Sequence, residues 1–168
     1  MSNTIHLQAG NSCAEIRPLG AQIVSYTAPD GREVIWQGDP AIWADHTPIL
    51  FPVIGNVKDG TVIIDDVTYP MTKHGFARRA MFTPVATGEN FVTLQLTESA
   101  ETLAQYPFEF ALDITYELTE RGFRCRFTVE NRSDHAMPFC VGGHPAFVVP
   151  IEAGAAFEDY QVIFPKDE

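Results

Sequence analysis

The sequence predicts an all-β protein, because short stretches of alternating apolar and polar residues are separated by turn-forming residues along most of the chain. The clearest alternation covers residues 108–118 (FEFALDITYEL), where every even position is large and apolar. Twelve glycines and twelve prolines are spread among these stretches, and only one short segment has helical character. This pattern favours an antiparallel β-sandwich or a similar sheet-on-sheet fold.

The clearest element is a β-hairpin formed by residues 108–118 and 123–129. The second strand repeats the period of two, and the short connector at residues 119–122 ends in glycine, which suits an antiparallel turn. On the exposed face, acidic side chains of the first strand should lie opposite arginines of the second. The residues expected in these pairs are Glu117, Glu109, Arg124 and Arg126.

The remaining elements are shorter. Ser99 can cap a helix over residues 99–105, and Pro107 stops it soon afterwards. Residues 157–164 (FEDYQVIF) begin a further alternating strand whose edge needs a partner, so the sequence resembles the first part of something larger and leaves room for a homodimer. Weaker strands are expected at residues 21–27, 33–36, 61–69 and 91–97.

Composition narrows the range of functions. A length of 168 residues with 45% hydrophobic content is sufficient for one domain, residues 1–168, with a substantial core. The net charge of -11 disfavours binding to nucleic acid or to anionic membranes, but it leaves neutral ligands open. Three cysteines without CxxC spacing, and a polar start without a signal-like apolar run, point to the cytoplasm.

Two histidine-containing segments differ from plain sheet: residues 73–79 (KHGFARR) and 140–147 (CVGGHPAF). Paired glycines before His144 permit close approach of a ligand, and Pro145 restricts the histidine to an extended conformation. A histidine held in this way suits proton transfer, because its pKa lies near neutral pH. The alternative for His144 is a hydrogen-bonded structural role. This structural role is the one expected for His6, His46 and His135. Trp36, Trp43 and Phe76 suit either stacking on a sugar ring or the core.

A series of short motifs resembles the aldose 1-epimerase (galactose mutarotase-like) family, in particular its bacterial branch of uncharacterised sugar epimerases. The motifs follow the family order, and their ordered combination is specific where each one alone is weak. They are residues 50–56 (LFPVIGN), 58–60 (KDG), 69–71 (YPM), 74–78 (HGFAR), 106–110 (YPFEF), 130–131 (EN), 137–138 (MP), 143–147 (GHPAF) and 157–160 (FEDY).

The resemblance implies an antiparallel β-sandwich of the supersandwich type, incomplete at its C-terminal end, and interconversion of the α and β anomers of a hexose. In the family mechanism a histidine of the GHP motif protonates the ring oxygen while a glutamate removes the anomeric hydroxyl proton. His144 matches this acid, and His74 matches a histidine that binds sugar oxygens. Asn56 is a further expected sugar-binding residue: it stands where many relatives have arginine, and its amide can still bind hydroxyls. No acidic residue here matches the glutamate. No cofactor is implied.

Three hypotheses follow. The first is an aldose epimerase acting on a neutral hexose or on a hexose phosphate, with Arg78 able to meet the phosphate. The second is a carbohydrate-binding domain that has the cleft but not the base. The third is a structural β-sandwich, which would leave the two histidine segments unexplained. A metal site at His74 and His144 is disfavoured, because HxH, HExxH and clustered carboxylates are absent from the sequence.

Overall fold

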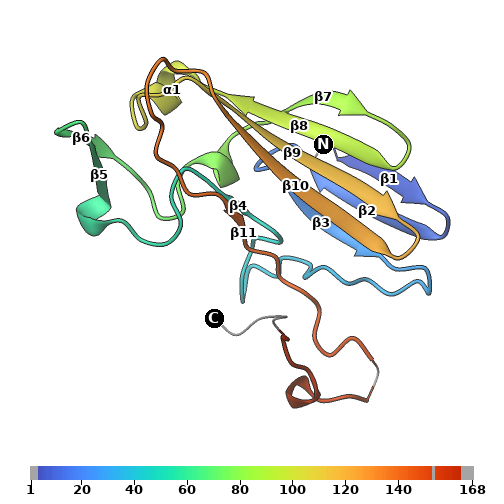
Figure 1. The fold of residues 1–168 in the computed structure, drawn as a ribbon. Coiled ribbons are helices and arrows are strands. Elements are labelled where there is room, and N and C mark those ends of the chain that lie inside the picture. The colour runs from blue at the N-terminus through green and yellow to red at the C-terminus, as the bar shows by residue number, and fades with distance from the viewer. Residues whose placement is uncertain (1–3, 153, 164–168) are drawn as a thin grey trace.

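Two antiparallel β-sheets pack face to face in a computed structural model that describes residues 4–152 and 154–163 (Figure 1). This arrangement confirms the predicted all-β sandwich. The first sheet contains, in spatial order, β1 (Ile5–Ala9), β2 (Ser12–Arg17) and β3 (Gln22–Thr27). The second sheet has the order β10-β9-β8-β7 and contains β7 (Thr83–Thr87), β8 (Phe91–Thr97), β9 (Phe110–Thr119) and β10 (Gly122–Asn131).

Smaller elements lie at one end of the sandwich. The two-residue strands β4 (Ile49–Leu50) and β11 (Gly142–Gly143) pair with each other, and β5 (Thr61–Ile64) forms a hairpin with β6 (Val67–Pro70). None of the described helices has the length and apolar character needed to cross a membrane. The helical turns are α1 (Ala100–Leu103), η1 (Lys58–Gly60), η2 (Ala77–Arg79) and η3 (Phe157–Asp159).

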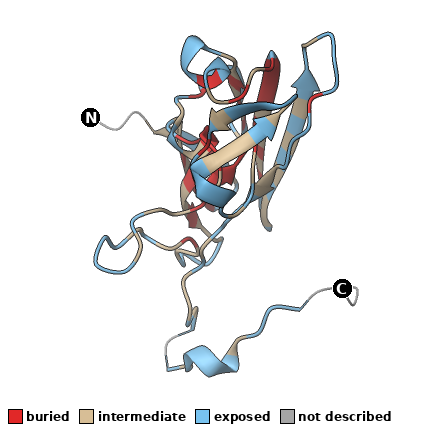
Figure 2. Ribbon diagram, turned by 90° about the vertical axis from the view of Figure 1, so that its left-hand side faces the viewer, coloured by how far each residue is buried: buried red, intermediate tan, exposed pale blue. Residues whose placement is uncertain are grey.

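The core lies between the two sheets, where the apolar faces of the strands meet (Figure 2). Every second residue of β9 from Phe110 to Leu118 is buried, as the period of two requires. Burial of each large apolar side chain stabilises the fold by about 1.5–3 kcal/mol. The buried Tyr116 hydroxyl donates a hydrogen bond of 2.9 Å to the carbonyl of Ala21, and this bond links the two sheets.

The predicted hairpin is confirmed as β9 and β10, joined by a two-residue turn. Arg124 lies opposite Glu117 and forms an ion pair with it at 3.1 Å, as expected. The expected pairing of Arg126 with Glu109 is wrong, because Arg126 lies opposite Thr115. Glu109 precedes β9, and the tight turn sets a register in which its carbonyl accepts a hydrogen bond from the N–H of Arg132.

Other predicted strands have mixed outcomes. The strands at 21–27 and 91–97 are confirmed as β3 and β8. The stretch 61–69 is two strands, because Asp65 and Asp66 adopt positive φ and turn the chain back on itself. The strand at 33–36 is wrong: Glu33 and Ile35 form only isolated bridges. The sequence analysis did not predict β1, β2 or β7.

The predicted helix shortens to α1, with Ser99 as its cap: the Thr102 N–H donates to the Ser99 hydroxyl, and the Ser99 N–H donates to the Thr102 hydroxyl. The predicted strand over residues 157–164 is wrong for its described part, and residue 164 lies outside the described residues. Residues 157–159 form the turn η3, and residues 160–163 form no strand. This segment is largely exposed and lies apart from the sheets (Figure 2), so the alternation finds no neighbouring strand to pair with.

Candidate active site

His74 lies in a tight loop after β6 and adopts a left-handed backbone conformation with φ of 67°. Its N–H donates to the carbonyl of Gly55 at 2.9 Å, and its own carbonyl accepts a hydrogen bond from the N–H of Phe51 at 3.3 Å. The imidazole is fixed as well, because the N–H of Gly55 donates to its Nδ1 at 3.0 Å. An Nδ1 that accepts this bond carries no proton, so neutral His74 presents Nε2–H as a hydrogen-bond donor.

Gly75 holds this loop against β4. Its φ of 73° is unfavourable for other residues, and a Cβ placed here would lie 2.0 Å from the carbonyl oxygen of Phe51. That oxygen accepts hydrogen bonds from the N–H groups of Phe76 and Ala77, at 3.0 and 3.2 Å. Only glycine permits this approach of two backbone segments, and the approach positions the histidine that precedes it.

His144 directly follows β11. Its N–H donates to the carbonyl of Pro48 at 3.0 Å, and the N–H of Ala146 donates to the carbonyl of His46, also at 3.0 Å. These bonds extend the pairing of β11 with β4. The backbone of His144 is therefore fixed, while its side chain is exposed to solvent.

The structure brings the two histidines together. The ring centroids of His74 and His144 lie 6.0 Å apart, and the Trp43 ring lies 5.3 Å from that of His144. The Trp43 carbonyl accepts a hydrogen bond of 2.8 Å from the indole N–H of Trp36, and this bond anchors the loop that carries Trp43. His46 bonds the Trp36 carbonyl at 2.7 Å, consistent with the structural role expected for it.

We call the face formed by Trp43, Asp45, His74, Arg78 and His144 the imidazole site.

Arg78 reaches the imidazole site from η2. Its side chain is 19% exposed and lies 4.0 Å from the carboxylate of Asp45, while its buried Nε has no partner among the described residues. Asn56 is exposed and lines a different hollow together with Lys73 and Gln105. The structure therefore brings His144, His74 and Arg78 together, and Asn56 directly follows Gly55, whose N–H donates to the His74 ring.

Sequence reasoning did not identify Asp45 as a neighbour of the site, and it left Trp43 undecided between stacking and core. Both residues belong to an irregular loop between β3 and β4, in which no periodic pattern marks the direction of a side chain. In the sequence, only the aromatic ring of Trp43 indicated a possible role at the site. For Asp45 the only indication was a charge opposite to that of Arg78.

The electrostatics of the imidazole site favour neutral His74. Burial and the positive charges of Lys73 and Arg78, with a contribution from His144, lower the pKa of the His74 imidazole. Protonation at Nδ1 would also break the bond from Gly55. His74 is therefore suited to donate a hydrogen bond from Nε2 rather than to carry a charge.

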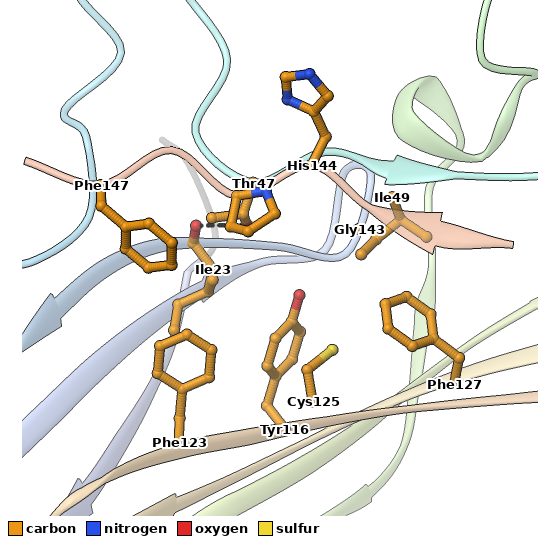
Figure 3. Close-up of a pocket in the computed structure, with 11 residues that line it drawn as sticks. Ile23, Thr47, Ile49, Tyr116, Phe123, Cys125, Phe127, Gly143, His144 and Phe147 are labelled. Atoms are coloured by element: carbon orange, nitrogen blue, oxygen red, sulfur yellow. Dashed lines mark hydrogen bonds between the residues drawn. The ribbon is translucent and has the colours of Figure 1, made fainter. Parts of the chain in front are cut away.

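A cavity of about 190 Å³ lies beneath the segment that carries His144. Its walls are apolar and include Phe123, Phe127 and Phe147, with Cys125 and Tyr116 at its floor. Figure 3 shows the imidazole of His144 directed away from this cavity. Because sugar hydroxyls require polar partners, the cavity does not suit a sugar; the polar imidazole site on the other side of the segment does.

Comparison with known proteins identifies the family. The model of the family described as aldose 1-epimerase matches residues 3–168. The chain belongs to the aldose 1-epimerase family. The plasmid-encoded and chromosomal LacX proteins of Lactococcus lactis subsp. lactis are each 34% identical to it over 171 residues, which is 98% of this chain and 57% of each relative.

Similar solved structures support the same family assignment. A galactose mutarotase related enzyme from Lactobacillus acidophilus superposes with a TM-score of 0.89 at 34% identity, covering 93% of this chain and 52% of that one. A galactose mutarotase-like protein from Lactobacillus casei gives 0.85 at 38% identity, covering 90% and 52%. The family resemblance inferred from the sequence is confirmed, and the chain spans little more than half the length of these relatives.

The close approach at Gly75 predicts a large cost for Gly75→Ala, because the new methyl group meets a backbone oxygen at a position where φ is already positive. We expect the free energy of unfolding to fall by about 3 kcal/mol or more. Gly31→Ala is the matched control: φ is 85° and no atom lies within 4 Å, so the cost should be about 1–2 kcal/mol. Urea denaturation measures both, and equal losses would contradict the steric account.

The charge beside His74 predicts that Lys73→Gln raises the pKa of this histidine, whereas Lys58→Gln leaves it unchanged. NMR titration of the imidazole protons measures the shift. Because the folded-state pKa is lowered, the stabilisation from neutral His74 is complete above the ordinary pKa of about 6.5 and declines as the pH falls below it. Lys73→Gln should weaken this decline. An unchanged His74 pKa in Lys73→Gln would exclude the proposed repulsion between Lys73 and protonated His74.

Proposed function

We propose that the imidazole site binds a hexose and interconverts its α and β anomers, as an aldose 1-epimerase. The observation that carries the proposal is the 6.0 Å approach of His74 and His144, which come from loops far apart in the sequence and belong to the two family motifs. Two imidazoles at this spacing can contact neighbouring oxygens of one pyranose, one as a proton donor and the other as a hydrogen-bond donor. Trp43 beside His144 offers an aromatic surface for the sugar ring.

His144 is the proposed general acid. Its exposed ring can deliver a proton to the ring oxygen of the sugar as the bond from that oxygen to the anomeric carbon breaks and the anomeric hydroxyl loses its proton to a base. The resulting aldehyde turns about its bond to the next carbon and closes on its other face, with the proton returned. Neutral His74, whose Nε2–H is free to donate, is proposed to bind a sugar oxygen throughout.

The base for this reaction lies outside the contacts of the two rings. Within residues 4–152 and 154–163, no carboxylate forms a hydrogen bond or an ion pair with His74 or His144. Because no acidic residue of the chain matches the family's glutamate, we also propose a second candidate function, in which the chain by itself binds a sugar without accelerating its anomerisation. The two candidate functions use the same site and differ in the rate of anomer exchange. An acid without its base contributes little to a proton exchange that needs both.

A neutral hexose is the proposed substrate, with a hexose phosphate as the alternative. Arg78 is mostly buried and lies beside Asp45, whose carboxylate offsets its charge and opposes an approaching phosphate. The net charge of -11 acts in the same direction. Cytoplasmic location is part of the proposal, supported by the free thiols of Cys13, Cys125 and Cys140.

The acid role of His144 predicts that His144→Gln slows catalysed anomer exchange by about 100-fold or more, since general acid catalysis contributes 10²–10⁴-fold. His135→Gln is the control: this histidine is exposed, bonds Asp134 and lies outside the imidazole site. Polarimetry of freshly dissolved α-glucose and α-galactose, with the buffer rate subtracted, gives the rates. Equal rates for the two variants would exclude His144 as the acid, and saturable binding without acceleration would establish the second candidate.

The Asp45–Arg78 pair predicts the substrate preference. We expect the chain to favour glucose over glucose 6-phosphate, and Asp45→Asn to improve binding of the phosphate by several-fold, because it leaves the Arg78 charge uncompensated. Calorimetric titration with each sugar measures the affinities, with Asp39→Asn, in the same loop, as the control. Tighter binding of the phosphate by the unmodified chain would assign the site to hexose phosphates.

A further inference from the structure

We infer that Ile54 and Gly142 form the subsite for the exocyclic carbon of the hexose, C6, on one side of His144. We call these two residues the apolar strip. The inference rests on the proposed function, because it takes His144 as the acid at the ring oxygen of the sugar. It adds the orientation of the sugar in the imidazole site and the part of the sugar that the apolar strip selects.

The pairing of β11 with β4 places Gly142 on the same face as His144. The hydrogen bond of 2.8 Å from the Cys140 N–H to the Pro52 carbonyl continues this pairing in register. Because side chains alternate between two faces along paired strands, residues 140, 142 and 144 share one face. Gly143 belongs to the other face and lines the apolar cavity, from which the His144 ring is directed away (Figure 3). Gly142 therefore lies on the floor of the imidazole site.

Ile54 lies over Gly142 and connects it to the other histidine. A Cβ placed at Gly142 would lie 3.1 Å from Cδ1 of Ile54. The Ile54 side chain is half exposed, and the next residue, Gly55, donates its N–H to the His74 ring. The apolar strip thus lies between the loop of His74 and the segment of His144. The missing side chain at Gly142 leaves room there for a ligand atom.

The two sides of His144 differ in polarity. The chain before residue 48 pairs with the residues that follow His144, so Asp45 lies on the side of His144 opposite to Gly142. On that side, Asp45 and Arg78 supply a carboxylate and a guanidinium. On the other side, the apolar strip offers a hydrocarbon surface.

This difference determines how the sugar lies. The ring oxygen has two carbon neighbours: C1, whose hydroxyl must give up a proton, and C5, which carries C6. A hydroxyl held against a hydrocarbon surface loses its hydrogen bonds to water, so C1 suits the charged side and C6 suits the apolar strip. This orientation also turns C6 away from Arg78, in keeping with a neutral hexose.

The test compares sugars that differ only at this carbon: glucose, 6-deoxyglucose and xylose, which is glucose without C6. NMR titration of the full chain measures the three dissociation constants and does not require catalysis. We expect glucose and 6-deoxyglucose to bind within about twofold of each other. Xylose should bind about fourfold more weakly, because it lacks one carbon that the apolar strip would bury.

Gly142→Ala and Gly143→Ala are matched variants of neighbouring residues on opposite faces. Neither glycine has a positive φ, and the methyl group of Gly143→Ala makes only an ordinary contact of 3.5 Å with Phe127. Gly142→Ala fills the apolar strip, so we expect it to weaken glucose and 6-deoxyglucose at least tenfold and to change xylose less than twofold. Gly143→Ala should leave all three dissociation constants within twofold.

A second pair of variants tests the chemistry of the apolar strip. Ile54→Asn should weaken 6-deoxyglucose relative to glucose by several-fold, because an amide can bind the C6 hydroxyl but not the methyl group. Ile63→Asn, at an exposed position on the β5–β6 hairpin, is the control and should leave this ratio unchanged.

The outcomes separate the inference from the proposed function. If the sugars bind but the ratio of glucose to xylose affinity is the same in Gly142→Ala as in the unmodified chain, the inference is overturned and the proposed function stands. If none of the three sugars binds the unmodified chain, the proposed function fails and the inference fails with it.

Discussion

The contact between the backbone of Phe51 and the loop at residues 74–77 is the constraint on which the site depends. The carbonyl of Phe51 accepts two hydrogen bonds from this loop, and Gly75 lies so close to it that no side chain fits. Since Phe51 is itself fully buried, the loop is attached directly to the close-packed core. The left-handed conformation of His74 is a local cost that the sandwich sustains through these contacts.

The same short region supports the second histidine. β4 lies directly before Phe51, and its pairing with β11 places the backbone of His144 across from Pro48. The chain from residue 46 to 51 therefore holds one histidine loop on each side, although the two histidines are seventy residues apart. A spacing of 6.0 Å between their rings follows from backbone pairing and needs no direct bond between the side chains.

The sequence predicts those parts of the molecule that local patterns determine. The β9–β10 hairpin, β3 and β8 could be predicted because each has one buried and one exposed face. The strand expected at 157–164 was wrong because alternation describes a preference, and pairing also requires a neighbour. Both histidine segments could be singled out from their glycines and from family motifs. Their meeting with Asp45 and Trp43 could not, because it depends on the course of an irregular loop.

The position of the apolar cavity connects the fold to the site. His144 has its ring on the polar side of its segment, while the other side of that segment roofs a cavity lined by β10. Hydrogen bonds to residues 46–48 fix this segment, and two further bonds join it to residues 34–36: the Trp36 N–H donates to the Ala146 carbonyl at 3.0 Å, and the Val148 N–H donates to the Val34 carbonyl at 2.8 Å. Backbone pairing with residues 34–36 and 46–48 therefore sets the position from which His144 faces His74, and the apolar side chains beneath the segment contribute no polar group to the site.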